Sequence, residues 1–256
     1  MDLIQTIILG VIQGLTEFLP ISSSGHLVLA QHLMGVETPG ILLEVTLHMG
    51  TMFAILIYYY DEIKQLIQSA IKNHGNSRMY IIYLVVATIP TVFAGLLLKN
   101  SIESTYTVSM VKYMLIITGL MVGSTYFFQN KVEKEIVVKT AFYIGIAQVF
   151  ALLPGISRSG MVISISIILG IQNDKAAKFA FFMALPVLLG AGLMQLFSKD
   201  LQSSLSFMPL LTGFISSAVT GYLVINWLLS VISKGKFYLF SLYCFMVSII
   251  LFIWIN

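Results

Sequence analysis

The chain has 256 residues, of which 58% are hydrophobic and only 10% charged, and its net charge is +3. A mean hydropathy of +0.94 excludes an ordinary soluble domain, in which about 25% of the residues are charged, and so small and dispersed a charge argues against nucleic acid as a partner. The composition therefore predicts an integral membrane protein surrounded by bilayer lipids. Helices are expected rather than a β-barrel, because period-2 alternation is absent.

The first hydrophobic stretch, residues 3–36, is interrupted by LPISSSGH around Pro20, and a second, residues 140–171, is interrupted by LLPGISRSG around Pro154. Each is predicted to form a re-entrant hairpin of two half-helices, which survives at membrane depth only inside protein or beside a water-filled cavity. Three uninterrupted windows long enough to span a bilayer follow each stretch, at 41–60, 79–98 and 110–128 and then at 178–197, 208–232 and 237–255.

The two interrupted stretches are related by an internal repeat with an offset of 135 residues. The offset pairs Gly10 with Gly145, Gln13 with Gln148, Ile21 with Ile156, Ser22 with Ser157, Ser24 with Ser159, Gly25 with Gly160 and Gly35 with Gly170. Within a single membrane domain, 1–256, each half (1–135 and 136–256) then holds one hairpin and three spans. The odd number of crossings turns the second half over, so the predicted fold is an all-α inverted-topology repeat.

The basic residues predict the orientation of this fold. In the predicted topology, ten basic residues lie on the side of the membrane opposite the amino terminus: Lys64, Lys72, Arg78, Lys131, Lys134, Lys139, Lys175, Lys178, Lys234 and Lys236. The amino-terminal side receives three, Lys99, Lys112 and Lys199. Because cytoplasmic loops are enriched in Lys and Arg, both termini of this multi-pass protein are predicted to lie outside.

Ionisable residues and hydroxyls gather in the two hairpins. Glu17, His26 and Arg158 stand in apolar sequence, where burying one charge costs about 2.5–3.5 kcal/mol. A structural ion pair alone would leave His26 and the surrounding hydroxyls unexplained. A cradle for a phosphate-sized anion explains them better. Its expected members are Ser22, Ser23, Ser24, Gly25, Gly155, Ser157, Ser159 and Arg158.

Further polar residues share helical faces with this site. Gln13 lies four residues before Glu17, so both side chains can point into one cavity. Glu44, on the first full span, is expected to support the site, whereas His48 is expected to be a structural histidine. The carboxylate and the imidazole supply a base, a nucleophile or a metal ligand.

The two motifs resemble the signatures of the bacterial undecaprenyl-diphosphate phosphatases of the bacitracin-resistance type. GVIQGLTEFLPISSSGH supplies Gln13, Glu17, Ser23 and His26, and LLPGISRSG supplies Pro154, Gly155, Ser157, Arg158 and Ser159. The resemblance extends over the whole chain in length, span pattern and repeat. One position departs from it, because Val162 stands where the family motif ends in threonine.

The resemblance implies an enzyme, a phosphoric-anhydride hydrolase of the bacterial plasma membrane. It would remove the terminal phosphate of a C55 polyprenyl diphosphate at the outer face, recycling the lipid carrier for cell-wall synthesis, with bacitracin resistance as a consequence. Arg158 would hold the phosphoryl group, and Glu17 would act as a base or bind a divalent cation, Mg²⁺ or Ca²⁺. Ser23, His26 and water all remain open as the nucleophile.

Two other functions are compatible with parts of the sequence. A phosphatidic-acid-phosphatase type enzyme needs a His six residues after its Ser-Arg and then an Asp, and SGMVISISI after Arg158 contains neither. A membrane transporter or flippase for polyprenyl phosphate lipids also fits an inverted repeat with a midplane anion site. The reactive groups Glu17, Ser23 and His26 favour the enzyme. Whether the chain forms a homodimer is open.

Overall fold

The computed structural model describes residues 2–36, 41–72, 74–98, 101–102, 104–128, 134–196 and 207–254, and within them every regular element is a helix. In chain order the helices are α1 Leu3–Phe18, α2 Ser23–Leu33, α3 Ile41–Tyr58, α4 Tyr60–Ile71, α5 Gly75–Leu97, α7 Val108–Ser124, η1 Thr125–Phe128, α8 Val138–Phe150, α9 Arg158–Ile168, α10 Asn173–Leu196, α11 Phe207–Ser233, η3 Phe237–Leu239 and α12 Phe240–Trp254.

The helices that are long and apolar enough to cross a bilayer coincide with the windows chosen from the sequence. Five described helices meet that test: α5, α7 continued by η1, α10, α11 and α12 preceded by η3. The helix α3 passes the test only together with α4, and the two are bent by 75° at their junction. The all-helical class is therefore confirmed, and the described residues hold five to six apolar helices of spanning length where the sequence predicts six spans.

Each interrupted stretch forms two short helices joined by a polar turn. In the first, α1 ends just before Pro20 and α2 begins after Ser22, whose side chain accepts a hydrogen bond from the Gly25 N–H. In the second, α8 and α9 flank the turn, and Ser157 caps α9 by accepting from the Gly160 N–H. Both caps satisfy backbone donors that would otherwise be unpaired at a helix amino terminus.

The hairpins are held between the long helices. The helix α1 packs along α11 and also contacts α3, α8 packs against α5, and α7 packs against α12. Close approach to α11 is possible because glycines face it: a Cβ on Gly14 would lie 2.6 Å from the Ser217 carbonyl oxygen, and one on Gly50 would lie 2.5 Å from that of Phe214. Small residues of this kind are typical of helix interfaces in membranes.

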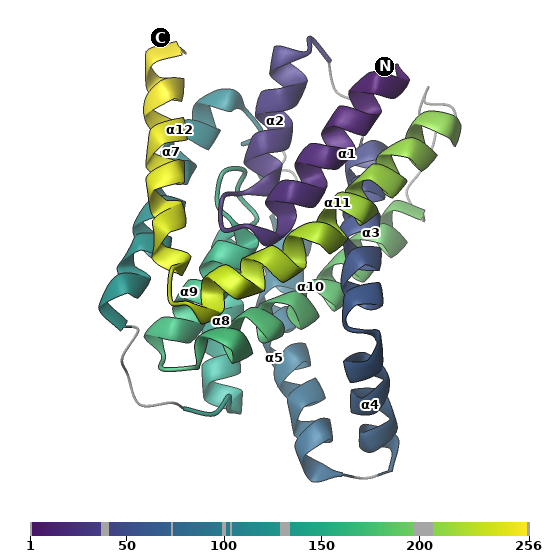
Figure 1. The fold of residues 1–256 in the computed structure, drawn as a ribbon, viewed down its shortest axis with the longest axis vertical. Coiled ribbons are helices and arrows are strands. Elements are labelled where there is room, and N and C mark those ends of the chain that lie inside the picture. The colour runs from purple at the N-terminus through teal and green to yellow at the C-terminus, as the bar shows by residue number, and fades with distance from the viewer. Residues whose placement is uncertain are drawn as a thin grey trace.

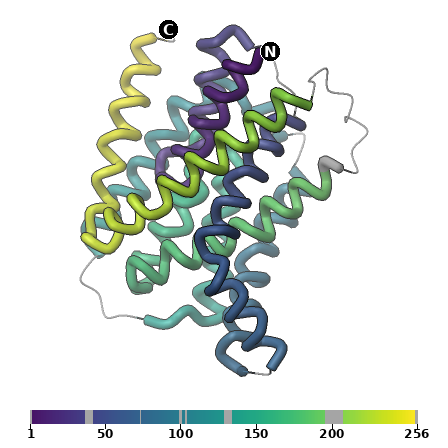
Figure 2. Tube along the Cα trace, turned by 45° about the vertical axis from the view of Figure 1, so that its right-hand side comes forward, coloured from purple at the N-terminus to yellow at the C-terminus, as the bar shows by residue number. Residues whose placement is uncertain are grey.

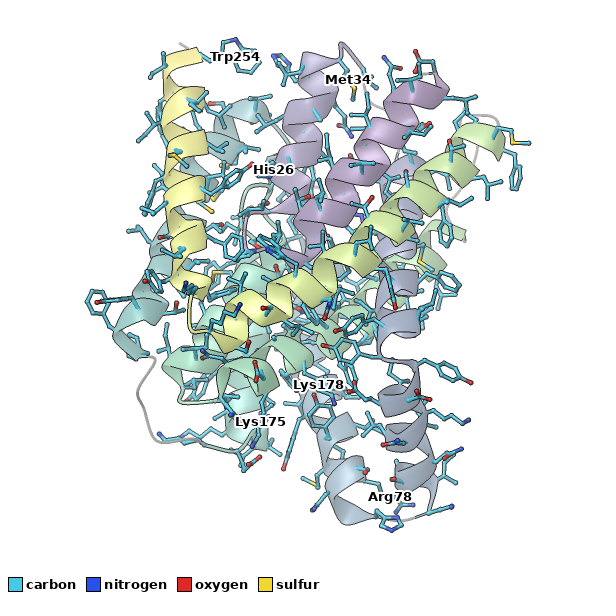
Figure 3. All side chains as sticks on the ribbon, viewed as in Figure 1. His26, Met34, Arg78, Lys175, Lys178 and Trp254 are labelled. Carbon is cyan, nitrogen blue, oxygen red and sulfur yellow. The ribbon has the colours of Figure 1, made fainter. Side chains whose placement is uncertain are left out.

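The two chain ends lie at the same end of the molecule, and the connection between α4 and α5 lies at the other (Figures 1 and 2). Arg78, Lys175 and Lys178 lie in the half away from the termini, whereas Trp254 and Met34 lie at the terminal end (Figure 3). Of the basic residues used to orient the chain, Lys99, Lys131 and Lys199 lie outside the described residues.

The helix α4 is absent from the windows chosen from the sequence. Its twelve residues include Asp61, Glu62 and Lys64 and have no uninterrupted apolar run, and none of them is buried. Apolar residues recur on one side of the helix only, a pattern typical of a helix at a surface rather than across a bilayer. Length of apolar sequence alone therefore does not reveal it.

Candidate active site

The centre of the site is the carboxylate of Glu17, on the last turn of α1 and only 6% exposed. Its Oε1 forms an ion pair with the Arg158 guanidinium. Its Oε2 accepts hydrogen bonds from Ser23 Oγ at 2.6 Å and from Gln13 Nε2 at 2.9 Å, and His48 Nε2 lies 3.6 Å away. Both hairpins and α3 thus contribute to the surroundings of one buried acid, which compensates the cost of burying it.

Arg158 is the first residue of α9 and is placed there by the second hairpin. One terminal nitrogen, Nη2, reaches Glu17. The other, Nη1, is buried without a hydrogen-bond partner among the described residues. A buried guanidinium donor without a partner is costly and is available to an anionic ligand.

The tips of the two hairpins are joined through Ser22. Its Oγ accepts from the Gly155 N–H at 3.1 Å as well as from the Gly25 N–H at 3.2 Å. Ser22 has a φ of 71°, a left-handed conformation that costs a residue with a side chain about 1–3 kcal/mol. The two hydrogen bonds offset that strain and fix the turn that presents Ser23.

Ser157 and Ser159 complete the junction from the other side. Both hydroxyls donate to the Leu19 carbonyl oxygen, at 3.3 and 3.0 Å, and they lie 3.1 Å from each other. The Thr118 hydroxyl, on α7, donates to the Gly155 carbonyl oxygen at 2.8 Å and accepts from the Ser157 N–H. These two serines therefore link the hairpins, and they also shape the cradle that was expected to hold an anion.

A cavity of about 190 Å³ opens beside the Glu17 and Arg158 pair. Its polar lining consists of Glu17, Ser23, Ser24, Glu44, His48, Thr91, Tyr106, Gln148, Ser157 and Arg158. Most of the polar residues expected at the site therefore face one space, from α1, α2, α3 and the second hairpin. Gln13 reaches that space through its bond to Glu17.

Four polar members of this lining were not expected there from the sequence: His48, Thr91, Tyr106 and Gln148. Gln148 donates to the Thr91 hydroxyl at 2.8 Å, and its Oε1 is buried without a partner among the described residues. The sequence could have indicated Gln148 as a site residue, because the internal repeat pairs it with Gln13. Nothing in the sequence indicates Thr91. His48 donates from Nδ1 to the Glu44 carbonyl oxygen at 2.7 Å, and this bond turns Nε2 toward Glu17.

His26 is not brought to the Glu17 carboxylate. On α2 its Nδ1 bonds the Ser22 carbonyl oxygen at 2.8 Å, and its Nε2 bonds the Tyr243 hydroxyl of α12 at 2.8 Å. The two rings also stack, with centroids 5.6 Å apart. Glu44 lines the cavity as expected, and its Oε1 accepts from Gln31 Nε2 at 3.3 Å.

The fold and the site define a membrane-spanning helical protein in which two broken hairpins meet around a carboxylate, a guanidinium and several hydroxyls. The chain belongs to the BacA family, because the family model described as bacitracin resistance protein BacA matches residues 6–250. Curated relatives named undecaprenyl-diphosphatase support this assignment. One from Halothermothrix orenii is 40% identical over 99% of this chain and 98% of its own. One from Methanobrevibacter smithii is 35% identical over 98% and 97% of the two chains, and one from Desulforudis audaxviator is 38% identical over 95% and 94%.

Proposed function

We propose that this chain is an undecaprenyl-diphosphatase, an enzyme that removes the terminal phosphate from a C55 polyprenyl diphosphate. The relatives that match nearly the whole chain carry that name. The observation that carries the proposal for this chain is the hydrogen bond from the Ser23 hydroxyl to the Glu17 carboxylate, beside Arg158 Nη1, which has no partner among the described residues. A base, a nucleophile and a phosphoryl-binding cation then share one cavity.

The geometry supports Ser23 as the nucleophile. The Ser23 Oγ attacks the terminal phosphorus while Glu17 accepts the hydroxyl proton, and Arg158 stabilises the charge on the phosphoryl oxygens. The bond from that phosphorus to the bridging oxygen breaks, and the polyprenyl monophosphate leaves with the electron pair. Water then attacks the phosphorus of the phosphoserine, the bond to Ser23 Oγ breaks, and Oγ recovers its proton from Glu17, while inorganic phosphate leaves with the oxygen and protons of the water. His26 serves this scheme from outside the cavity, by fixing α2 against α12 through Tyr243.

A divalent cation, Mg²⁺ or Ca²⁺, is proposed to bind together with the substrate. The described residues hold no group of three His, Cys, Asp or Glu side chains that could bind an ion alone. The donors present fit the usual mode for Mg²⁺, in which one or two carboxylates act with phosphate oxygens. These donors are the Glu17 carboxylate and Gln13 Oε1, which is buried without a partner among the described residues. The cation would neutralise charge on the diphosphate.

The inverted repeat is proposed as the origin of this architecture. The packing supports it, because equivalent helices of the two halves make equivalent contacts. The repeat relates α1 to α8 and α5 to α11, and just as α1 packs on α11, α8 packs on α5. The hairpin turns support it too, since Ser22 and Ser157 each accept from the N–H three residues later. The termini are proposed to lie outside the plasma membrane, with the cavity accessible from the outer face and the polyprenyl tail among the spans.

Phosphate release by the purified protein tests this function. With a C55 polyprenyl diphosphate in detergent and Mg²⁺ or Ca²⁺, the wild type is expected to release one inorganic phosphate per substrate. Arg158→Ala is expected to lower kcat by about 10²–10³, the usual effect of removing one charge-stabilising donor. Gly95→Ala, a change in open space on α5, serves as the control and should keep full activity.

A transporter would move polyprenyl phosphate across the bilayer without releasing inorganic phosphate. If the wild type releases no phosphate while proteoliposomes move polyprenyl phosphate across the bilayer, the enzyme assignment fails. Full activity in Arg158→Ala would leave the enzyme standing and overturn the assignment of the site.

A further inference from the structure

A second and larger cavity lies apart from the Glu17 site. It has a volume of about 710 Å³ and is lined by α4, the first half of α5, the first half of α10 and the segment around Glu135. None of its lining residues belongs to the Glu17 cavity. Its size is that of a pocket for a drug-sized or lipid head-group ligand, about 300–1,000 Å³.

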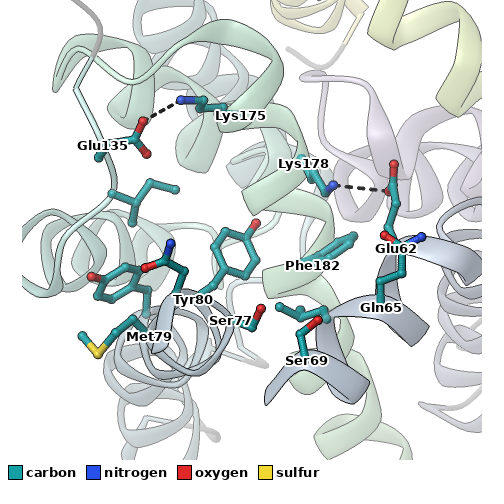
Figure 4. A pocket seen from close by; sticks show the side chains of 14 residues that line it. Glu62, Gln65, Ser69, Ser77, Met79, Tyr80, Glu135, Lys175, Lys178 and Phe182 are labelled. Carbon is teal, nitrogen blue, oxygen red and sulfur yellow. Dashed lines mark hydrogen bonds and ion pairs between the residues drawn. The ribbon is translucent and has the colours of Figure 1, made fainter. Parts of the chain in front are cut away.

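The charges around this cavity are arranged as two separate ion pairs. Lys175 Nζ lies 2.7 Å from Glu135 Oε1, and Lys178 Nζ lies 3.4 Å from Glu62 Oε2. Figure 4 shows the two pairs at two sides of the cavity with the rings of Tyr80 and Phe182 between them. The lining thus presents two cations and two anions with no net charge, a distribution that suits a ligand carrying both signs.

The helix α4, which lines this cavity, has the residue pattern of a helix at a membrane surface. Its polar residues Glu62, Gln65 and Ser69 share one face and line the cavity, as their spacing of three and four residues requires. On another face Ile67 and Ile71 are 50% and 76% exposed. This division, together with the bend after α3, is typical of a helix that lies in the bilayer interface with its apolar face in lipid.

We propose that this cavity binds the head group of a zwitterionic phospholipid that carries a primary ammonium, of the phosphatidylethanolamine type. The phosphate is held by Lys178, and the ammonium donates hydrogen bonds to Glu62. The apolar lining residues, among them Leu66 and Phe182, contact the glycerol backbone and the start of the acyl chains. A trimethylated ammonium has no N–H to donate, and a glycerol head group has no cation, so both fit less well.

Native mass spectrometry of the purified protein in detergent tests this site with three lipids of equal chain length. Phosphatidylethanolamine is expected to bind about tenfold more tightly than phosphatidylcholine or phosphatidylglycerol, a ratio close to the lower limit for one hydrogen bond to a charged group. Lys178→Met and Glu62→Gln should each abolish that preference. Lys64→Ala, on the same helix but outside the lining, should keep it.

Because each single variant removes half of an ion pair, the double variant Glu62→Gln with Lys178→Met provides a second test in which no charge is left unpaired. It should melt as the wild type does and still lack the preference. A wild type that binds the three lipids equally, or a preference that survives in the double variant, overturns the proposal. Soluble glycerophosphoethanolamine distinguishes the source of the head group: much weaker binding than the lipid supports a lipid site, and equal affinity contradicts it.

Discussion

Ser23 is the serine of the first hairpin turn that is placed to act as the nucleophile. Its hydroxyl donates to Glu17 Oε2 at 2.6 Å, so the proton of the attacking oxygen already points at its acceptor. No other serine of the first turn is placed in this way: Ser22 is occupied by the two glycine N–H groups, and Ser24 lies 3.3 Å from Ser22.

A phosphorylated intermediate on Ser23 is therefore expected. After rapid acid quenching with a substrate labelled in its terminal phosphate, the label should be recovered on the peptide that contains Ser23. Ser23→Ala should lose the label and lower kcat by about 10⁴ or more, because the loss of a nucleophilic serine costs up to about 10⁶. His26→Phe should retain the label while lowering the melting temperature, because it loses the bonds to Ser22 and Tyr243. Label on His26 in the wild type would contradict the assignment.

Single residues of the site were predictable from sequence where their chemistry conflicts with an apolar neighbourhood. Glu17, Ser23 and Arg158 stand out for this reason, and the structure brings all three together. Thr91 does not stand out, because threonine is common in spanning helices and its contact with Gln148 joins helices 57 residues apart in sequence. The direction of the His26 ring depends on α12, and no local pattern contains that information.

At the scale of the element, the two hairpin turns must approach more closely than side chains allow. Gly155 has a φ of 98°, and a Cβ added there would lie 2.7 Å from Met114 Cβ and 2.9 Å from the Val111 carbonyl oxygen of α7. A Cβ on Gly25 would meet the Gly155 Cα at 3.1 Å. The contact between the hairpins therefore depends on glycine at this turn.

Gly155→Ala is expected to destabilise the fold by about 2 kcal/mol or more, because left-handed strain and overpacking act together. The midpoint of thermal unfolding in detergent should fall accordingly, and activity should fall with it since Ser22 loses its fixed partner. The matched control is again Gly95→Ala, where a Cβ meets nothing within 4 Å and alanine favours the helix by about 1 kcal/mol. Equal midpoints for the two variants would refute this role of the turn.

The elements themselves divide into predictable and unpredictable groups for a physical reason. Spanning helices and broken hairpins follow from the length and interruption of apolar runs, since the bilayer sets both. The helix α4 has no such run, and its position is defined instead by the 75° bend after α3 and by the ion pair of Glu62 with Lys178 on α10. That pair joins residues 62 and 178, and only the folded structure brings them together.

For the whole molecule, the chain ends and the α4 to α5 connection lie at opposite ends (Figure 1), and the charge of the loops determines which end faces the cytoplasm. Arg78, Lys175 and Lys178 lie in the half away from the termini (Figure 3). If the half that contains these basic residues faces the cytoplasm, the terminal end faces the outside. The first hairpin, with α1 and the turn at Ser23, then extends into the membrane from the outer face.

Cysteine labelling in intact cells checks this orientation with little background, because Cys244, the chain's one cysteine, is fully buried. Asp2→Cys, at the terminal end, is expected to react with a membrane-impermeant maleimide added to intact cells. Asn76→Cys, at the start of α5 beside the second cavity, is expected to react only after the membrane is opened. Wild-type protein should stay unlabelled in both conditions. Labelling of Asn76→Cys but not Asp2→Cys in intact cells would reverse the orientation, and the Glu17 cavity would then belong to a hairpin entered from the cytoplasm.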